Sequence, residues 1–134
     1  MHHPRSRQTA KYVKLIKRCK LEPITLAKKI VSYLEEKLAE DILLLDLRGV
    51  CDFTDFFVLA TGTSDRMLTS LAESTEEKSK ADGAGNPFIE GLPLSGWMVM
   101  DYASVVVHLF SPEKRAYYQL EDLWKDGKIL LRLK

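Results

Sequence analysis

The stretch 56-FFVLATGTSDRMLTSL-71 predicts the centre of the fold, because it passes from a β-strand pattern directly into an α-helix pattern. Its first six residues form an almost wholly apolar run, which is typical of a buried strand. Ser64 stands where a helix N-cap is expected, and Gly83 stands where the helix would stop. Four apolar residues between them share one side of the helix: Met67, Leu68, Leu71 and Ala72.

The turn Gly62-Thr63-Ser64 raises the question of a phosphate site, because backbone N–H groups at a helix N-terminus bind anions. Neither G-x-x-x-x-G-K-[ST] nor G-x-G-x-x-G occurs in the chain, however. A nucleotide-transferring site also needs carboxylates that hold magnesium, and no Asp-x-Asp pair is present. We therefore interpret the turn as a structural connection. The alternative is a nucleotide-binding enzyme that uses Gly62, Thr63, Ser64 and Arg66.

The segment before this unit predicts a helix followed by a second buried strand. Residues 24–40 place four leucine or isoleucine residues four apart, which predicts one apolar stripe: Leu26, Ile30, Leu34 and Leu38. Thr25, after Pro23, is the expected N-cap. The run 41-DILLLDL-47 is continuously aliphatic, as in a strand covered on both faces.

The segment after the central unit contains three strand patterns, in residues 87–91, 96–101 and 104–110, joined by links too short for crossover helices. We expect antiparallel hairpins at one side of the sheet. A helix is then predicted over residues 111–124, with Ser111 as N-cap and Pro112 at the first helical position.

These elements predict an α/β fold, a mixed five-stranded sheet flanked by helices. We divide the chain into a basic arm (1–22), one domain (23–125) and a C-terminal tail (126–134), which is amphipathic but is left without an assigned element. The longest apolar runs are far shorter than the roughly 20 residues needed to span a bilayer, so no membrane segment is expected.

The formal net charge of +1 hides an uneven distribution of charge. Residues 1–20 carry seven basic side chains and no acidic one, whereas residues 21–134 carry 13 basic and 19 acidic side chains. Such an arm can contact a phosphate backbone, can be a solvated tail, or can be compared loosely with an organelle transit peptide. Cys19 and Cys51 lack metal-ligand spacing, and we expect reduced thiols in a cytoplasm-like compartment.

The run 97-WMVMDY-102 has the composition of a protein-binding surface, with large apolar side chains, adaptable thioethers and one carboxylate. Strand alternation separates Trp97 and Asp101 on one face from Met98 and Met100 on the other, and packing beneath a helix explains one face equally well. His108 is the only histidine after position 3, and we interpret it as a structural or surface-binding residue rather than a catalytic one.

Three blocks together resemble the signature of the ribosomal silencing factor family, also called Iojap: residues 51-CDFTDFFVLATGTSDR-66, 96-GWMVMDYASVVVHLF-110 and 112-PEKRAYYQLEDLW-124. The resemblance covers about residues 24–125. It implies a nucleotidyltransferase-like topology without catalytic carboxylates, and no enzymatic activity, cofactor or metal. It also implies binding to the fourteenth protein of the large ribosomal subunit, which sterically blocks joining of the small subunit and represses translation.

For the chain as a whole, the resemblance implies a cytoplasmic bacterial protein, with an organelle protein as the alternative. It leaves open an assembly or maturation role for the large subunit, and it implies that a homodimer can form. For the basic arm, we predict auxiliary contact with ribosomal RNA.

The resemblance also implies a partner-binding surface on the hairpin strands and the following helix. The implied residues are Trp97, Met98, Met100, Asp101, Tyr102, His108, Tyr118, Glu121 and Trp124. Trp97 and Met98 are the expected apolar anchors, and Asp101 and Glu121 the expected contacts for basic side chains. Since sequence does not decide which strand face is exposed, we expect some of the nine to be core. Where relatives often have Gly-Asp, this chain has Ala103 and Ser104.

Overall fold

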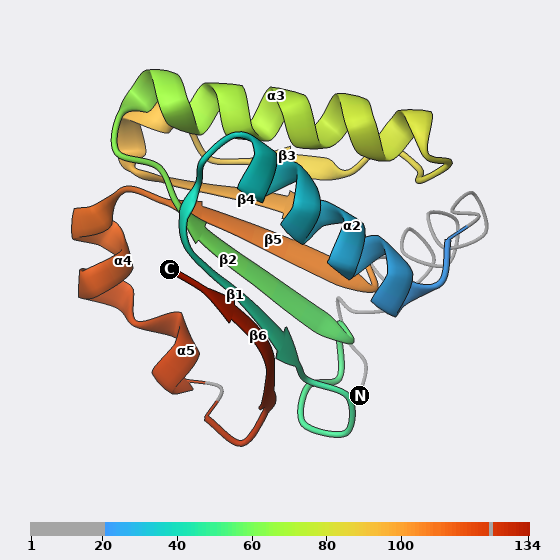
Figure 1. Ribbon diagram of the computed structural model, residues 1–134. Helices are drawn as coiled ribbons and strands as arrows, with labels where there is room; N and C mark the ends of the chain where they lie inside the picture. Colours follow the sequence, from blue (N-terminus) through green and yellow to red (C-terminus); the bar gives the residue numbers. More distant parts are fainter. Residues whose placement is uncertain (1–20, 124) are drawn as a thin grey trace, which may run out of the picture.

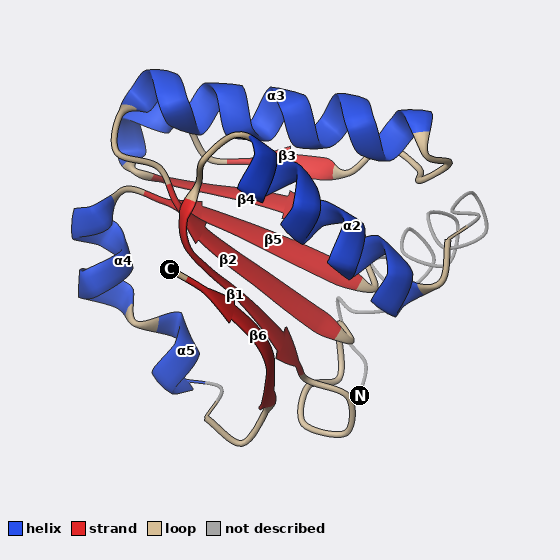
Figure 2. Cartoon of the chain, viewed as in Figure 1, coloured by secondary structure: helices blue, strands red, loops and turns tan. Residues whose placement is uncertain are grey.

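The central strand and helix are present as the sequence predicts. The structure, a computed structural model, describes residues 21–123 and 125–134. Figures 1 and 2 show helices packed on a twisted, mixed sheet. The elements are α2 (Pro23–Glu36), β1 (Glu40–Asp46), β2 (Phe56–Thr61), α3 (Asp65–Ala81), β3 (Phe88–Glu90), the 3₁₀ helix η1 (Pro93–Ser95), β4 (Trp97–Asp101), β5 (Val105–Phe110), α4 (Pro112–Tyr118), α5 (Leu120–Leu123) and β6 (Lys128–Leu133). Residues 1–20 of the basic arm, which include Cys19, and Trp124 lie outside the described residues.

The sheet has six strands in the order β3-β4-β5-β2-β1-β6. Strands β2 and β5 run parallel in its middle, and the other neighbours are antiparallel. The α/β class and the hairpins β3-β4-β5 at one side are therefore confirmed. The expected strand number of five is wrong, because residues 128–133 pair with β1 as an edge strand instead of forming a tail. Its apolar residues Ile129 and Leu130 are exposed, which is why the short segment lacks the pattern of a buried strand.

Two apolar clusters lie on opposite faces of the sheet. Helices α2 and α3 lie across one face (Figure 1), where they bury Ile30, Leu34 and Leu68 completely. The second cluster, on the other face, contains Leu43, Leu45 and Phe57, with Leu120 from α5. Every residue of β2 and β5 is buried, which confirms that these strands are covered on both faces.

Helix α3 begins and ends as expected. The Ser64 hydroxyl accepts a hydrogen bond from the Met67 N–H at 3.1 Å, and Gly83 follows the helix with a left-handed φ of 101°. Such a φ suits glycine because it has no Cβ to collide with the backbone.

Three expectations about the other helices are wrong. Glu22 is the N-cap of α2 in place of Thr25, because Pro23 takes the first helical position. Leu38 lies beyond the end of α2, has a φ of 63° and is 78% exposed, so it does not extend the apolar stripe. The helix predicted over residues 111–124 begins at its Ser111 cap but is split into α4 and α5 at Gln119, whose φ is 49°.

The turn after α2 explains how a helix passes so directly into β1. The Ala39 N–H donates to the Leu34 carbonyl and the Leu38 N–H to the Glu35 carbonyl, a Schellman motif with leucine where glycine is usual. Among the described helices, none is long and apolar enough to cross a membrane.

Candidate partner-binding surface

Strand β4 sends alternate side chains to the two faces of the sheet, and this decides which predicted site residues are accessible. Met98 and Met100 are 7% and 0% exposed and belong to the cluster beneath α2 and α3. Tyr102 is also buried there, and its hydroxyl lies 2.7 Å from Ser79 Oγ of α3. The expectation that Met98 is an apolar anchor is therefore wrong, and Met100 and Tyr102 are likewise core residues.

Trp97 lies on the opposite face and is held by three aromatic neighbours. Its indole stacks on Phe110 with ring centroids 5.1 Å apart, and the Tyr118 ring lies 4.5 Å away. Its Nε1–H donates to Nδ1 of His108 at 3.1 Å. Trp97 is half-buried and Tyr118 is 39% exposed, so part of this cluster faces solvent in a fixed orientation.

His108 is a buried support for Trp97. Because Nδ1 accepts the hydrogen bond from Trp97, the ring proton belongs on Nε2. Burial lowers the pKa of His108 to about 4, so the imidazole is neutral at physiological pH. The Phe57 ring packs against it at 4.6 Å. Since His108 is only 6% exposed, it supports Trp97 from within the fold.

Helix α4 extends the exposed aromatic area beyond Trp97. Tyr117 is 77% exposed and stands edge-on to Tyr118, with ring centroids 5.0 Å apart. The Lys114 ammonium lies 6.0 Å from the centroid of each tyrosine ring, at the outer limit of a cation–π contact. We call Trp97, Lys114, Tyr117 and Tyr118 the aromatic surface. The sequence did not single out Lys114 and Tyr117, because the solvent-facing side of a short helix shows no periodic pattern of apolar residues.

The two predicted acidic contacts also make bonds within the chain. Asp101 Oδ1 accepts from the Ala103 N–H at 2.8 Å, which closes the turn between β4 and β5. Ala103 has a left-handed φ of 72° there, which accounts for glycine at this position in the family pattern. Glu121 Oε2 lies 3.4 Å from Nε of Arg115. Trp124, the last of the nine predicted residues, lies outside the described residues.

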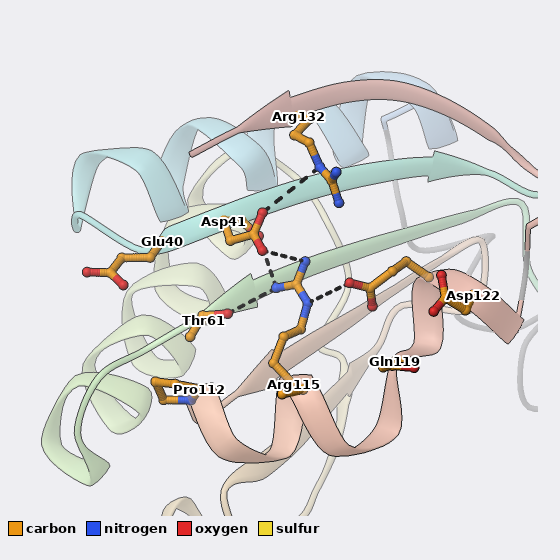
Figure 3. Close-up of a pocket in the computed structure, with 10 residues that line it drawn as sticks. Glu40, Asp41, Thr61, Pro112, Arg115, Gln119, Asp122 and Arg132 are labelled. Atoms are coloured by element: carbon orange, nitrogen blue, oxygen red, sulfur yellow. Dashed lines mark hydrogen bonds and ion pairs between the residues drawn. The ribbon is translucent and has the colours of Figure 1, made fainter.

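Arg115 anchors α4 to strands far away in sequence (Figure 3). It is buried, and its Nη1 donates to the Asp41 carbonyl and to Thr61 Oγ1, both at 3.0 Å. Its Nη2 lies 3.6 Å from Asp41 Oδ2. These residues line a cavity of about 510 Å³ between α4 and the strands β1, β2 and β6. The arginine thereby sets the position of the helix that carries the two exposed tyrosines.

The Gly62-Thr63-Ser64 turn is explained by packing and capping. A Cβ on Gly62 would lie 2.9 Å from Leu68 Cδ2, so glycine lets the leucines of α3 pack closely against the strand end. The Ser64 hydroxyl is occupied by the N-cap bond. Within residues 21–123 and 125–134, no group of three His, Cys, Asp or Glu side chains is placed to hold a metal ion.

Comparisons with known proteins show which proteins this chain is similar to. The family model described as "Ribosomal silencing factor during starvation" matches residues 20–132. The ribosomal silencing factor RsfS of Zymomonas mobilis is 34% identical over 106 residues, which are 79% of this chain and 80% of that protein. The mouse "Mitochondrial assembly of ribosomal large subunit protein 1" is 35% identical over 98 residues, 71% of this chain and 43% of its own length. A crystal structure of a Chromobacterium violaceum protein matches with a TM-score of 0.75 at 32% identity, covering 78% of this chain and 88% of that one.

Proposed function

This chain belongs to the ribosomal silencing factor family, and from that membership we propose that it binds the large ribosomal subunit and prevents the small subunit from joining. The proposed contact is the aromatic surface, and the proposed receptor is the fourteenth protein of the large subunit, as the sequence resemblance implies. The place of action is then the bacterial cytoplasm, or an organelle as the alternative. In this proposal the protein acts by covering a surface of the large subunit and catalyses no reaction. This agrees with relatives that are named as silencing factors and not as enzymes.

The observation that carries this proposal is the fixed, half-exposed indole of Trp97. Tryptophan and tyrosine are the side chains that most often dominate protein interfaces, particularly where neighbours hold them in place. Here His108, Phe110 and Tyr118 restrain the indole before any partner arrives. Less side-chain freedom remains to be lost on binding, which strengthens association.

Co-sedimentation with purified bacterial large subunits tests the proposal. The wild-type protein should sediment with the large subunit at low-micromolar concentration and should reduce the formation of joined ribosomes when small subunits are added. Trp97→Glu should abolish both effects, because it places a charge where an apolar ring is buried on binding. A wild-type protein that stays in the supernatant would contradict the proposal.

Two further variants keep this test specific. Ile129→Glu introduces the same charge at an exposed apolar position on β6, and it should sediment as the wild type does. Tyr117→Ala truncates a side chain that is 77% exposed, so it should weaken binding without affecting the fold. Circular dichroism spectra of all variants should match the wild type. If Ile129→Glu lost binding as completely as Trp97→Glu, the assignment to the aromatic surface would be wrong.

A role in assembly of the large subunit is the second candidate, and the mouse relative's name is the observation that favours it. The two roles differ in the particle that is affected. Silencing acts on mature subunits, so it is reproduced with purified components, whereas an assembly factor changes the sedimentation profile of precursor particles in depleted cells. A depletion strain with normal large-subunit maturation and increased joining in starved cells would favour silencing.

A further inference from the structure

Two leucines in the connection between β3 and β4 are largely exposed. Leu92 is 67% exposed and Leu94 is 84% exposed. They flank Pro93 in residues 91–96, which we call the leucine turn and which include η1. Side chains this exposed gain little burial energy on folding, so the two leucines on this short turn are available for contact with another molecule.

The leucine turn is held in one conformation by its backbone. Gly91 and Gly96 have left-handed φ angles of 89° and 78°. A Cβ on Gly91 would lie 2.2 Å from the Trp97 carbonyl oxygen, and one on Gly96 would lie 2.7 Å from Ser111 Oγ. Both positions therefore require glycine. The Ser95 hydroxyl donates to the Leu92 carbonyl at 2.6 Å, which closes the turn from inside. A turn held in this way loses little conformational entropy on binding.

The leucine turn is continuous with the aromatic surface. The Ser111 N–H donates to the Gly96 carbonyl at 2.9 Å, so the start of α4 is hydrogen-bonded to the end of the turn. The Cβ position of Gly96 also lies 2.8 Å from Lys114 Cγ. Trp97 follows Gly96 directly in the chain. In Figure 1 the β3-to-β4 connection and the β5-to-α4 connection lie at the same end of the sheet.

The chemistry of the leucine turn favours a protein over a nucleic acid as its partner. Residues 91-GLPLSG-96 contain no charged side chain, whereas binding to a phosphate backbone needs lysine or arginine. Two leucines also supply far less than the roughly 1,200 Å² that a stable protein interface buries. The turn can therefore act only as part of a larger interface, and the aromatic surface adjoins it.

We propose that Leu92 and Leu94 form a second apolar contact with the same ribosomal protein that the aromatic surface binds, seated in an apolar patch of that protein beside the site that receives Trp97. The inference rests on the proposed function. In this arrangement Trp97 provides the central anchor, and the rigid leucine turn slows dissociation at its margin.

The test compares the wild type with the double variant Leu92→Ser/Leu94→Ser in equilibrium and kinetic binding to purified large subunits. The Kd should rise about tenfold to hundredfold, mainly through faster dissociation, as expected when two buried leucines are lost from an interface. Because the contact is apolar, the ratio of the Kd of the double variant to the Kd of the wild type should be nearly the same at low and high salt. Both leucines are exposed, so the unfolding midpoint should not fall.

The matched control is Ile129→Ser/Leu130→Ser on β6, which removes two exposed apolar side chains at the opposite edge of the sheet and should leave the Kd unchanged. If the wild type binds and the leucine-turn variant has a Kd within twofold of it, the inference is wrong while the proposed function stands. If the wild type does not bind, both are wrong. If the double variant changes only self-association in sedimentation equilibrium, the turn contacts a second copy of this chain and the inference is overturned.

Discussion

Replacement of Arg115 by methionine should destabilise the protein by about 3 kcal/mol, because it removes a buried guanidinium while leaving its acceptors in place. Methionine keeps an unbranched apolar stem like that of arginine but lacks the guanidinium and cannot donate a hydrogen bond. The Thr61 hydroxyl, on a residue that is 5% exposed, and the Asp41 carbonyl would both lose the 3.0 Å bonds from Nη1.

The expected loss of about 3 kcal/mol comes mainly from the two hydrogen bonds donated by Nη1 of Arg115, and the ion pairs add a smaller contribution. Hydrogen bonds that involve a charged group contribute about 1.5–3 kcal/mol each, at the low end where partners can turn toward water. The ion pairs to Asp41 and Glu121 are longer, at 3.6 and 3.4 Å, and the Asp41 side chain is 44% exposed, so solvent screens that pair. A loss of about 3 kcal/mol would be a large share of the roughly 5–15 kcal/mol that stabilises a typical domain.

Urea unfolding followed by circular dichroism measures this loss as a lower midpoint with an unchanged slope. Thr61→Val is the matched control: it removes one acceptor and keeps the other partners of Arg115, so it should cost about 1.5 kcal/mol. A loss below 1 kcal/mol for Arg115→Met, or an equal loss in both variants, would refute the reasoning that this arginine joins α4 to β1 and β2.

Three further predictions concern the buried histidine and the central turn. The unfolded chain protonates His108 near pH 6.5, whereas the folded state keeps it neutral to about pH 4. The contribution of His108 to the free energy of unfolding should therefore be complete above about pH 6.5. It should fall by about 3 kcal/mol as the pH drops from about 6.5 to about 4. His108→Gln should flatten this dependence in urea titrations between pH 4 and 7, and an unchanged slope would exclude His108 as its source. Gly62→Ala should destabilise the fold by about 1–2 kcal/mol, because the added Cβ would lie 2.9 Å from Leu68 Cδ2. Calorimetry with a nucleoside triphosphate and magnesium should give no heat of binding for the wild type, whereas micromolar binding would restore the enzyme alternative.

Features that depend on residues close together in the chain could be predicted from the sequence. The Ser64 cap and the left-handed Gly83 follow from local backbone chemistry, and the apolar run 56–61 follows from the need to bury both faces of a central strand. The three sequence blocks likewise pointed to the family that the comparisons then showed. Trp97 was singled out for its residue type and its place on the hairpin.

The exposure of the candidate surface residues depends on contacts between segments far apart in the chain. Met98 and Trp97 have equally suitable side chains, and only the packing of α3 on one face of β4 makes the first a core residue and leaves the second at the surface. The bonds of Arg115 reach across 54 and 74 residues to Thr61 and Asp41, so no local pattern reports them.

Some features of this protein follow from short-range sequence patterns, and others follow only from the packing of distant segments. The sequence determined helix α3, the inner strands and the family, because hydrophobic period, caps and turn residues act within a few positions of one another. The tertiary structure decided the exposed face of β4, the pairing of β6 with β1 and the junction of the leucine turn with α4. Each of these three features depends on which apolar side chains are covered by another element. That is decided only when the sheet and its covering helices pack together.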